Sequence, residues 1–129
     1  MRVYNKWHSM IKKELKKINL THPQFVVLAS LAYLSQNGNE ITQIIISKLA
    51  GIDVMTVSQI LNLLEKNDFV KRKEHSKDTR AKAVILNKKG EEVLQKAVPL
   101  VEQIDEIFFK KLDTDEEQFK HFLARLNEE

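Results

Sequence analysis

The sequence predicts a mainly α fold with a small β component (α+β), in which helices surround a single β-hairpin. Apolar residues recur every three or four positions along most of the 129-residue chain, the spacing typical of amphipathic helices. Only three glycines and two prolines are present, too few for an all-β sandwich. The length suits one domain over residues 1–129, with an N-terminal helix (1–20), a central lobe (21–90) and C-terminal helices (91–129).

The first helices are predicted from periodicity and capping residues. An amphipathic helix covers residues 3–18, with lysines on its polar face. Thr21 and Gln24 form a capping box for a second helix that runs to Ser35. Thr42 caps a short helix that runs through Ala50. We expect the inward face of this helix to be formed by Ile45, Ile46 and Leu49.

Residues 42–66 predict a helix-turn-helix. A turn at Gly51 follows the short helix, and Asp53 then caps a helix over residues 54–66. Its apolar stripe is Val57, Ile60, Leu61 and Leu64.

A β-hairpin follows this pair of helices. Residues 69–73 and 83–86 are predicted strands, and the polar loop between them is charged. Helix, turn, helix and basic hairpin is the winged-helix order. Asn87 is expected to cap a long helix over residues 88–111 that Pro99 kinks, and Asp113 or Thr114 to cap the last helix.

Charge is spread unevenly over the chain, although the net charge is only +3. Residues 71–90 hold eight basic and two acidic side chains, a net charge of +6, and residues 1–20 carry +5. Residues 91–129 hold five basic and eleven acidic side chains, a net charge of −6. The basic central segment predicts a polyanionic partner, and a solvated charged face is the alternative interpretation.

Composition and motifs exclude several classes of protein. With no cysteine, disulfides, cysteine-ligated zinc and thiol redox sensing are ruled out. We expect no metal site, because the four histidines show no known ligand spacing, and no other cofactor. No phosphate loop or nucleophile motif is found, so we do not expect an enzyme. Neither a signal peptide nor a bilayer-length apolar run is found, and we expect a cytoplasmic protein without a membrane partner.

The helix over residues 54–66 is the candidate recognition helix for double-stranded DNA. Its outward face is polar and carries little charge. Glutamine and asparagine can make bidentate contacts to adenine, and a methionine can touch a thymine methyl group. The helix N-terminus also favours a nearby phosphate. The candidate DNA-binding residues here are Val54, Met55, Thr56, Ser58, Gln59 and Asn62.

The hairpin tip is the second candidate contact with DNA. Asp78 can hold the Arg80 guanidinium by a charge-assisted hydrogen bond, which suits insertion into a narrow minor groove. A surface ion pair with no further role is the alternative. The other candidate phosphate contacts are Thr42, Lys71, Lys73, Lys77 and Lys82.

Several of these segments together resemble the MarR family of bacterial regulators. The matching segments are Leu20-Thr21-His22-Pro23-Gln24-Phe25, Leu49-Ala50-Gly51-Ile52-Asp53, Leu63-Leu64-Glu65-Lys66, Asp78-Thr79-Arg80-Ala81-Lys82 and Leu86-Asn87-Lys88-Lys89-Gly90. The resemblance implies a winged-helix homodimer on a palindromic operator, usually a ligand-responsive repressor of transcription. It also implies a wing arginine in the minor groove, here Arg80. The chain departs from the family at Asp68 (usually glycine), Asn87 (commonly threonine) and Gln59 (often basic).

The terminal helices carry more apolar surface than a small winged domain can bury. We expect two chains to pack through both termini, with a monomer whose terminal helices fold back on the core as the alternative. The expected interface residues are Trp7, Met10, Leu15, Phe108, Phe119, Phe122 and Leu126.

The family resemblance also implies a site for a small aromatic or other apolar effector, between the dimer helices and the DNA-binding lobe. An aromatic stripe at helical spacing is also typical of plain core. The candidate pocket residues are Trp7, His8, Ile11, Phe25 and Leu28. A rival to DNA binding is a winged-helix interaction module whose basic hairpin binds an acidic protein.

Overall fold

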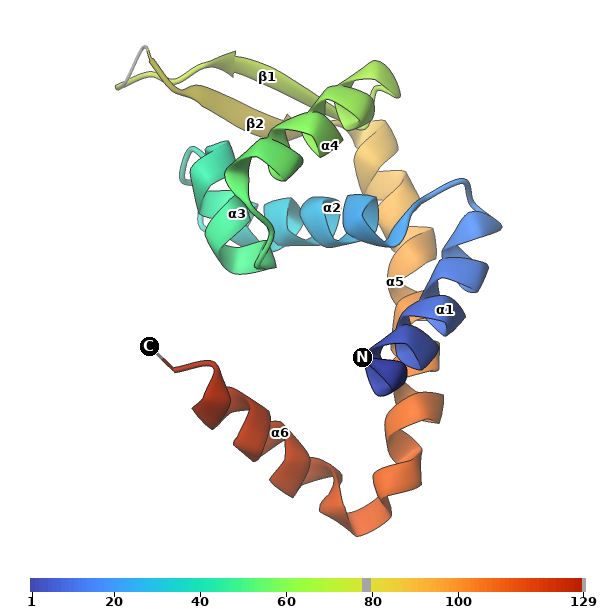
Figure 1. The fold of residues 1–129 in the computed structure, drawn as a ribbon. Helices are drawn as coiled ribbons and strands as arrows, with labels where there is room; N and C mark the ends of the chain where they lie inside the picture. The colour runs from blue at the N-terminus through green and yellow to red at the C-terminus, as the bar shows by residue number, and fades with distance from the viewer. Residues whose placement is uncertain (78–79, 129) are drawn as a thin grey trace.

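The computed structural model describes residues 1–77 and 80–128 and confirms the predicted mainly helical fold with one hairpin. Six α-helices, one 3₁₀ segment and two strands are found there (Figure 1). In chain order they are α1 (Arg2–Lys16), α2 (His22–Ser35), α3 (Gln43–Ala50), α4 (Val54–Lys66), β1 (Val70–Glu74), β2 (Lys82–Leu86), α5 (Lys88–Phe109), η1 (Lys110–Asp115) and α6 (Glu116–Leu126).

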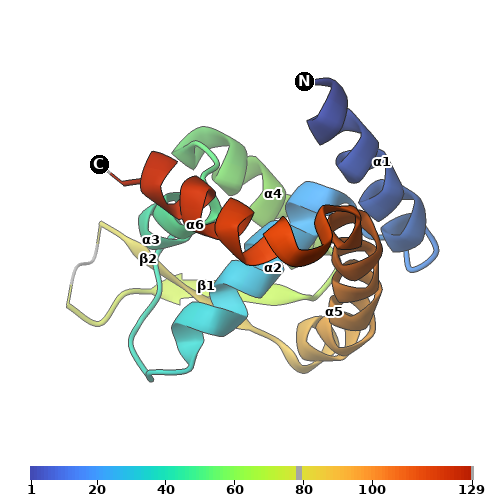
Figure 2. The same ribbon diagram turned by 90° about the horizontal axis from the view of Figure 1, so that it is seen from below.

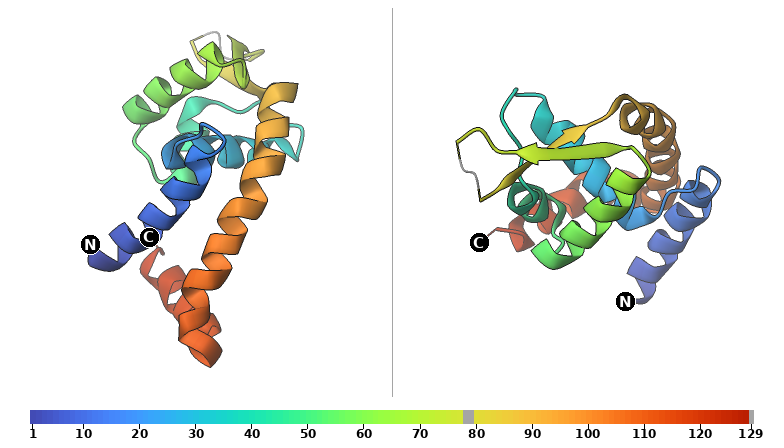
Figure 3. Two further views of the ribbon diagram at one scale, coloured as in Figure 1. Left: turned by 90° about the vertical axis from the view of Figure 1, so that its right-hand side faces the viewer. Right: turned by 90° about the horizontal axis from the view of Figure 1, so that it is seen from above.

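The helices divide into an upper lobe and a set of terminal helices. Helices α2, α3 and α4 form the lobe with the hairpin, and α5 runs away from it as a long rod (Figure 1). Helix α1 packs along α5, and α6 turns back beneath the lobe (Figures 1 and 2). Seen from the side, α5 extends well beyond the lobe, so the terminal helices project from it (Figure 3).

The core lies where α1, α2, α4, α5 and the hairpin meet. The predicted stripe of α4 is buried as expected. Helix α3 corrects the expected inward face: Ile46 is buried, but Ile45 and Leu49 are 39% and 48% exposed. Helix α3 has only eight residues and packs on α2 and α4. The most deeply buried side chains are Ile11, Leu15, Val27, Leu28, Leu31, Ile46, Val57, Leu61, Leu64 and Val70.

Three predicted caps begin the helices of the lobe. The hydroxyl of Thr21 accepts from the Gln24 amide while Gln24 Oε1 accepts from the Thr21 amide, the expected capping box. Thr42 caps α3 by accepting from the Ile45 amide, and Asp53 caps α4. Gly51 lies between them at φ 70°, a left-handed conformation that glycine adopts without strain.

Of the two other predicted caps, Asn87 is right in position only and the cap of the last helix is wrong. The Asn87 side chain makes no capping bond to α5; its Nδ2 instead donates to the carbonyl and carboxylate oxygens of Asp68. Asp68 has a φ of 64°, so this bond holds a strained residue at the turn before β1. Helix α6 begins at Glu116, later than expected, because η1 lies between it and α5. Helix α5 runs through Pro99 without a break.

The hairpin is antiparallel and is attached to the helical lobe. Val70 pairs with Leu86, and Glu74 pairs with Lys82 at the far end. The Val84 amide donates to the Ile41 carbonyl at 2.7 Å, and Thr42 forms a β-bridge with Ala83. The segment before α3 therefore acts as a short third strand beside β2.

None of the helices in the described parts of the chain is on its own long and apolar enough to span a bilayer. Only α3 and α4 taken together reach that length and composition, and they are bent by 111° at their turn.

Gly90 allows α5 to approach the turn before β1. A Cβ at this position would lie 2.2 Å from the Phe69 carbonyl oxygen and 2.8 Å from Leu86 Cδ1. We expect Gly90→Ala to lower the free energy of unfolding by about 1–3 kcal/mol, because backbone must move to relieve the overlap. Urea unfolding measures this. Lys88→Ala, an exposed change in the same turn, should stay within about 0.5 kcal/mol of the wild type, and an equally stable Gly90→Ala would contradict the contact.

Candidate nucleic-acid interface

The outward face of α4 carries the predicted recognition residues. Met55 is 74% exposed, and Gln59 and Asn62 are also exposed. Val54, at 38%, lies at the exposed start of the helix. Thr56 and Ser58 are half-buried. The polar face thus stands clear of the lobe, on the side opposite the buried stripe.

A carboxylate occupies the N-terminus of α4. Asp53 accepts from the Thr56 amide at 3.0 Å and from the Thr56 hydroxyl at 2.6 Å. The hydrogen bond from the Thr56 hydroxyl has the largest effect in lowering the pKa of the Asp53 carboxyl, and the bond from the Thr56 amide adds to it. The Thr56 hydroxyl proton is therefore already used within the chain. The negative charge also makes this helix end a poor place for a phosphate.

Arg72 joins β1 to the second half of α4. Its Nη2 donates to Glu65 Oε1 at 3.0 Å and to Asn62 Oδ1, and its backbone amide donates to Glu65 Oε2 at 3.0 Å. The guanidinium bond lowers the pKa of the Glu65 carboxyl. The sequence did not predict this contact, because it depends on how β1 packs against α4.

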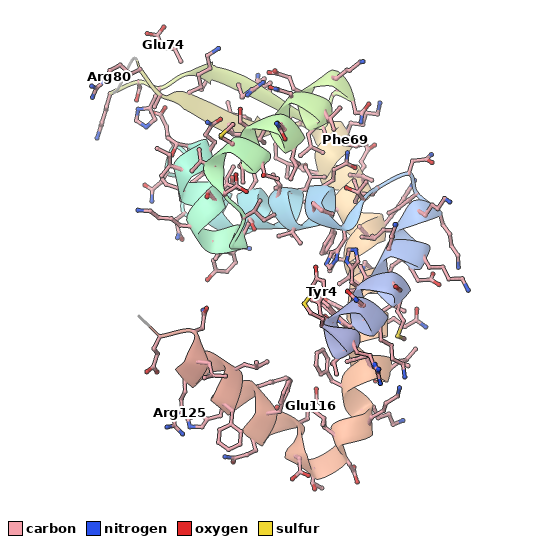
Figure 4. The ribbon with its side chains drawn as sticks, in the orientation of Figure 1. Tyr4, Phe69, Glu74, Arg80, Glu116 and Arg125 are labelled. Carbon is pink, nitrogen blue, oxygen red and sulfur yellow. The ribbon has the colours of Figure 1, made fainter. Side chains whose placement is uncertain are left out.

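One hollow brings together three of the predicted DNA-contacting elements. It has a volume of about 550 Å³ and lies between the start of α3, the start of α4 and the hairpin. Arg80 lies at the far end of the hairpin (Figure 4). Asp78, predicted to support it, lies outside the described residues. The lining residues are Thr42, Gln43, Ile44, Val54, Arg80, Ala81 and Lys82.

The predicted lysines of the hairpin do not share one environment. Lys71 and Lys73 alternate along β1 with Arg72, which faces α4, so they lie on the other face of the strand. Lys73 lies close enough to Glu40 to act on that carboxyl. Lys77 and Lys82 are exposed, and Lys82 lines the hollow with Arg80. The cations nearest the start of α3 and α4 are therefore Arg80 and Lys82.

Glu40 fixes the tip end of β1 to the lobe. It accepts from the Ser76 amide at 3.1 Å and from the Ser76 hydroxyl. The bond from the Ser76 hydroxyl has the largest effect in lowering the pKa of the Glu40 carboxyl, and the bond from the Ser76 amide adds to it. The charges of His75 and Lys73 lower this pKa as well. The hairpin is thus held at both of its ends.

The predicted dimer residues divide into covered and exposed ones. Leu15 is fully buried in the chain's own core, so its assignment to a subunit interface is wrong. Trp7 and Met10 are half-buried against that core, and the Trp7 indole donates to Asp105 of α5 at 2.7 Å. Phe108 is also half-buried. The α6 residues stand out instead: Phe119, Phe122 and Leu126 are exposed, Leu126 at 83%.

The predicted effector pocket is largely corrected. Ile11 and Leu28 are fully buried core, and Phe25 packs against that core. A groove of about 580 Å³ opens instead at the corner between α1 and α2, where of the five predicted residues only His8 lies. Trp7 borders it through His22, packing edge-on at 5.2 Å between ring centroids. The groove is lined by His8, Lys12, Lys16, Asn19, Leu20, Thr21, His22 and Pro23.

Two histidines that looked scattered in the sequence meet in this groove. The Nδ1 atoms of His8 and His22 lie 2.7 Å apart, so one ring donates a hydrogen bond to the other, and Tyr4 stacks on the His8 ring. Burial lowers the pKa of His22, His8 lowers it further and Asp105 opposes the shift. No group of three histidine or acidic side chains suited to a metal is found over residues 1–77 and 80–128.

Comparison with known proteins places the chain among winged-helix regulators. The winged-helix domain family described as ArnR1-like matches residues 16–104. YdcH of Bacillus subtilis (strain 168), described as an uncharacterized HTH-type transcriptional regulator, is 35% identical over 103 residues, or 80% of this chain and 70% of YdcH.

Solved structures share the fold. A mutant MarR from Escherichia coli, complexed with operator DNA, has a TM-score of 0.87 and 22% identity, covering 98% of this chain and 89% of MarR. BpsR of Bordetella bronchiseptica, whose DNA binding is regulated by 6-hydroxynicotinic acid, has a TM-score of 0.83 and 25% identity, covering 96% of this chain and 86% of BpsR.

The helix-turn-helix and its basic hairpin define a winged-helix protein. The chain belongs to the ArnR1-like winged-helix family and is a DNA-binding transcriptional regulator that shares the fold of MarR. The resemblance seen in the sequence is confirmed. The relatives are regulators and not enzymes, as the sequence predicts.

The lowered pKa of His22 predicts a pH-dependent stability. Below about pH 6.5 the unfolded chain takes up a proton at this side chain more readily than the folded chain does. The free energy of unfolding therefore decreases as the pH is lowered. We expect the melting temperature to drop between about pH 8 and about pH 5.5, and His22→Gln to reduce that drop. His121→Gln, an exposed change on α6, should leave it unaltered. The same drop in His22→Gln and wild type would contradict the assignment.

Proposed function

We propose that the protein is a ligand-responsive repressor that binds a palindromic operator as a homodimer in the bacterial cytoplasm. The observation that carries this proposal is the hollow that brings the starts of α3 and α4 and the basic hairpin to one side of the lobe. A double helix placed there meets an uncharged polar helix face and a row of cations at the same time. That combination suits base reading and phosphate contact together.

In this arrangement α4 enters the major groove and the hairpin follows the neighbouring minor groove. The Gln59 amide on α4 can pair with a base edge, and Arg80 can enter a narrow minor groove where the negative potential is strongest. Lys77 and Lys82 then lie near the flanking phosphates. The start of α3, capped by Thr42 and free of acidic residues in its first turn, offers a further phosphate contact.

The exposed apolar face of α6 supports the homodimer. Phe122 and Leu126 lie on a helix that makes few contacts with the rest of its own chain, and Ile107 of α5 is 51% exposed near the same end. A second copy of the chain covers such a surface with its own equivalent helices. Two recognition helices related by a two-fold axis would lie about 34 Å apart, one turn of DNA.

The groove at the α1–α2 corner supports the response to a ligand. It lies between a terminal helix and the first helix of the lobe, the position expected for an effector that changes the angle between them. BpsR, a structural relative, responds to 6-hydroxynicotinic acid. Lys12 and Lys16 on one wall favour a small aromatic effector that carries an acidic group.

Arg80→Ala is expected to weaken operator binding and to leave the fold intact. Without the guanidinium, the affinity for the DNA upstream of its own gene should fall, and the slope of log K against log salt should become shallower by about 0.9. Titrations at about 50 mM and about 200 mM salt measure both quantities, with random DNA for comparison.

Arg125→Ala on α6 is the matched control, since it removes the same charge far from the hairpin (Figure 4). Equal affinities for Arg80→Ala and Arg125→Ala would remove the hairpin from the interface. Binding to neither DNA at either salt concentration would favour the rival function, an interaction module for an acidic protein.

Leu126→Asp is expected to convert the dimer to monomers, because a carboxylate would enter an apolar interface without a partner. Light scattering gives the mass directly. Gln118→Asp, an equally charged change at an exposed position of α6, should remain dimeric. A dimer that persists in Leu126→Asp would place the subunit interface elsewhere.

A further inference from the structure

The exposed face of α4 carries a stripe of three residues, of which two were predicted from the sequence to contact DNA. Met55, Gln59 and Leu63 follow one another at intervals of four and therefore lie in one line on the helix. Leu63 was not among the predicted DNA contacts, yet it is 52% exposed, and Met55 is 74% exposed. We call these three residues the α4 stripe.

The α4 stripe is apolar at both ends and has one amide in its centre. The opposite face of the helix is buried through Val57, Leu61 and Leu64, so the fold itself does not need the stripe to be apolar. It holds no arginine or lysine, the side chains that most often read guanine through O6 and N7. An exposed apolar face next to a cationic hairpin suits a partner that has methyl groups and phosphates together.

The Arg72 contact decides which amide on α4 can read adenine. A bidentate contact needs the amide oxygen to accept from N6 and the amide nitrogen to donate to N7. Asn62 Oδ1 already accepts from Arg72, which also holds Glu65. Gln59 is exposed on the stripe, clear of this cluster. Asn62 is therefore a positioning partner of Arg72, and Gln59 is the amide available to a base.

We infer that the α4 stripe selects operator half-sites in which an adenine is flanked by thymines. Gln59 contacts the adenine edge, and Met55 and Leu63 pack on the C5-methyl groups of the thymines. This inference rests on the proposed operator binding and names the sequence class that the recognition helix prefers. Arg72 keeps α4 and the hairpin in one orientation, so the stripe and Arg80 meet the DNA in a fixed register.

Replacing thymine with deoxyuridine tests the methyl contacts without changing base pairing. The full-length protein first selects its preferred duplex from random double-stranded DNA, and half-site thymines are then replaced one at a time. We expect the affinity of the wild-type protein to fall by about fourfold for each contacted methyl group, the effect of exposing one buried carbon.

Two variants assign the methyl groups to side chains. Met55→Ala and Leu63→Ala should each bind the thymine duplex more weakly, and each should lose sensitivity to one of the deoxyuridine replacements. Tyr33→Ala removes another exposed side chain, on α2. The affinity of this control should fall as much as that of the wild type at every deoxyuridine replacement. Circular dichroism confirms that each variant is folded.

Three results would overturn the inference: a selected half-site without thymine, an unchanged wild-type affinity for deoxyuridine DNA, or the same sensitivity in both variants as in the wild type. In each of these cases salt-dependent, sequence-preferring binding would still support the proposed function. Failure to select any sequence would reject the proposed function and this inference together.

Discussion

The attachment of the hairpin to the helical lobe is the constraint on which the rest of the structure depends. A two-stranded hairpin is marginal in water on its own. Here the Val84 amide pairs with the Ile41 carbonyl, and Arg72 ties β1 to Glu65 of α4. These contacts lie at different points along the strands, so a rotation of the hairpin against α4 would break them. Gly90 completes the joint by letting α5 reach the turn before β1.

A rigid joint allows the two DNA-contacting elements to carry different chemistry. Asp53 makes the start of α4 unsuitable for phosphate, and the exposed face of that helix is left with amides and apolar side chains. The cations that line the hollow beside the starts of α3 and α4 are Arg80 and Lys82. Under the proposed function, salt-dependent affinity would therefore arise mainly at Arg80 and Lys82, and discrimination among bases at Gln59 and its neighbours. Because the hairpin is tied to α4, neither element can shift on the DNA without moving the other.

The sequence predicted the order of the elements because helix period and caps are local signals. Thr21, Thr42 and Asp53 cap where expected, since each acts on residues three positions away. What could not be predicted depends on distant parts of the chain. Periodicity identified the apolar face of α1, but not that the chain itself covers Leu15. Likewise, His8 and His22 meet only because the corner between α1 and α2 folds back.

That corner also connects the terminal helices to the lobe. Trp7 of α1 donates to Asp105 of α5, and His8 of α1 is hydrogen-bonded to His22, the first residue of α2. Helix α2 in turn packs on α3 and α4. A change in the charge or occupancy of the groove would therefore act on α1 and on the start of α2 at once. Because Arg72 ties the hairpin to α4, a small rotation of α2 would displace both proposed DNA contacts together, as the proposed response to a ligand requires.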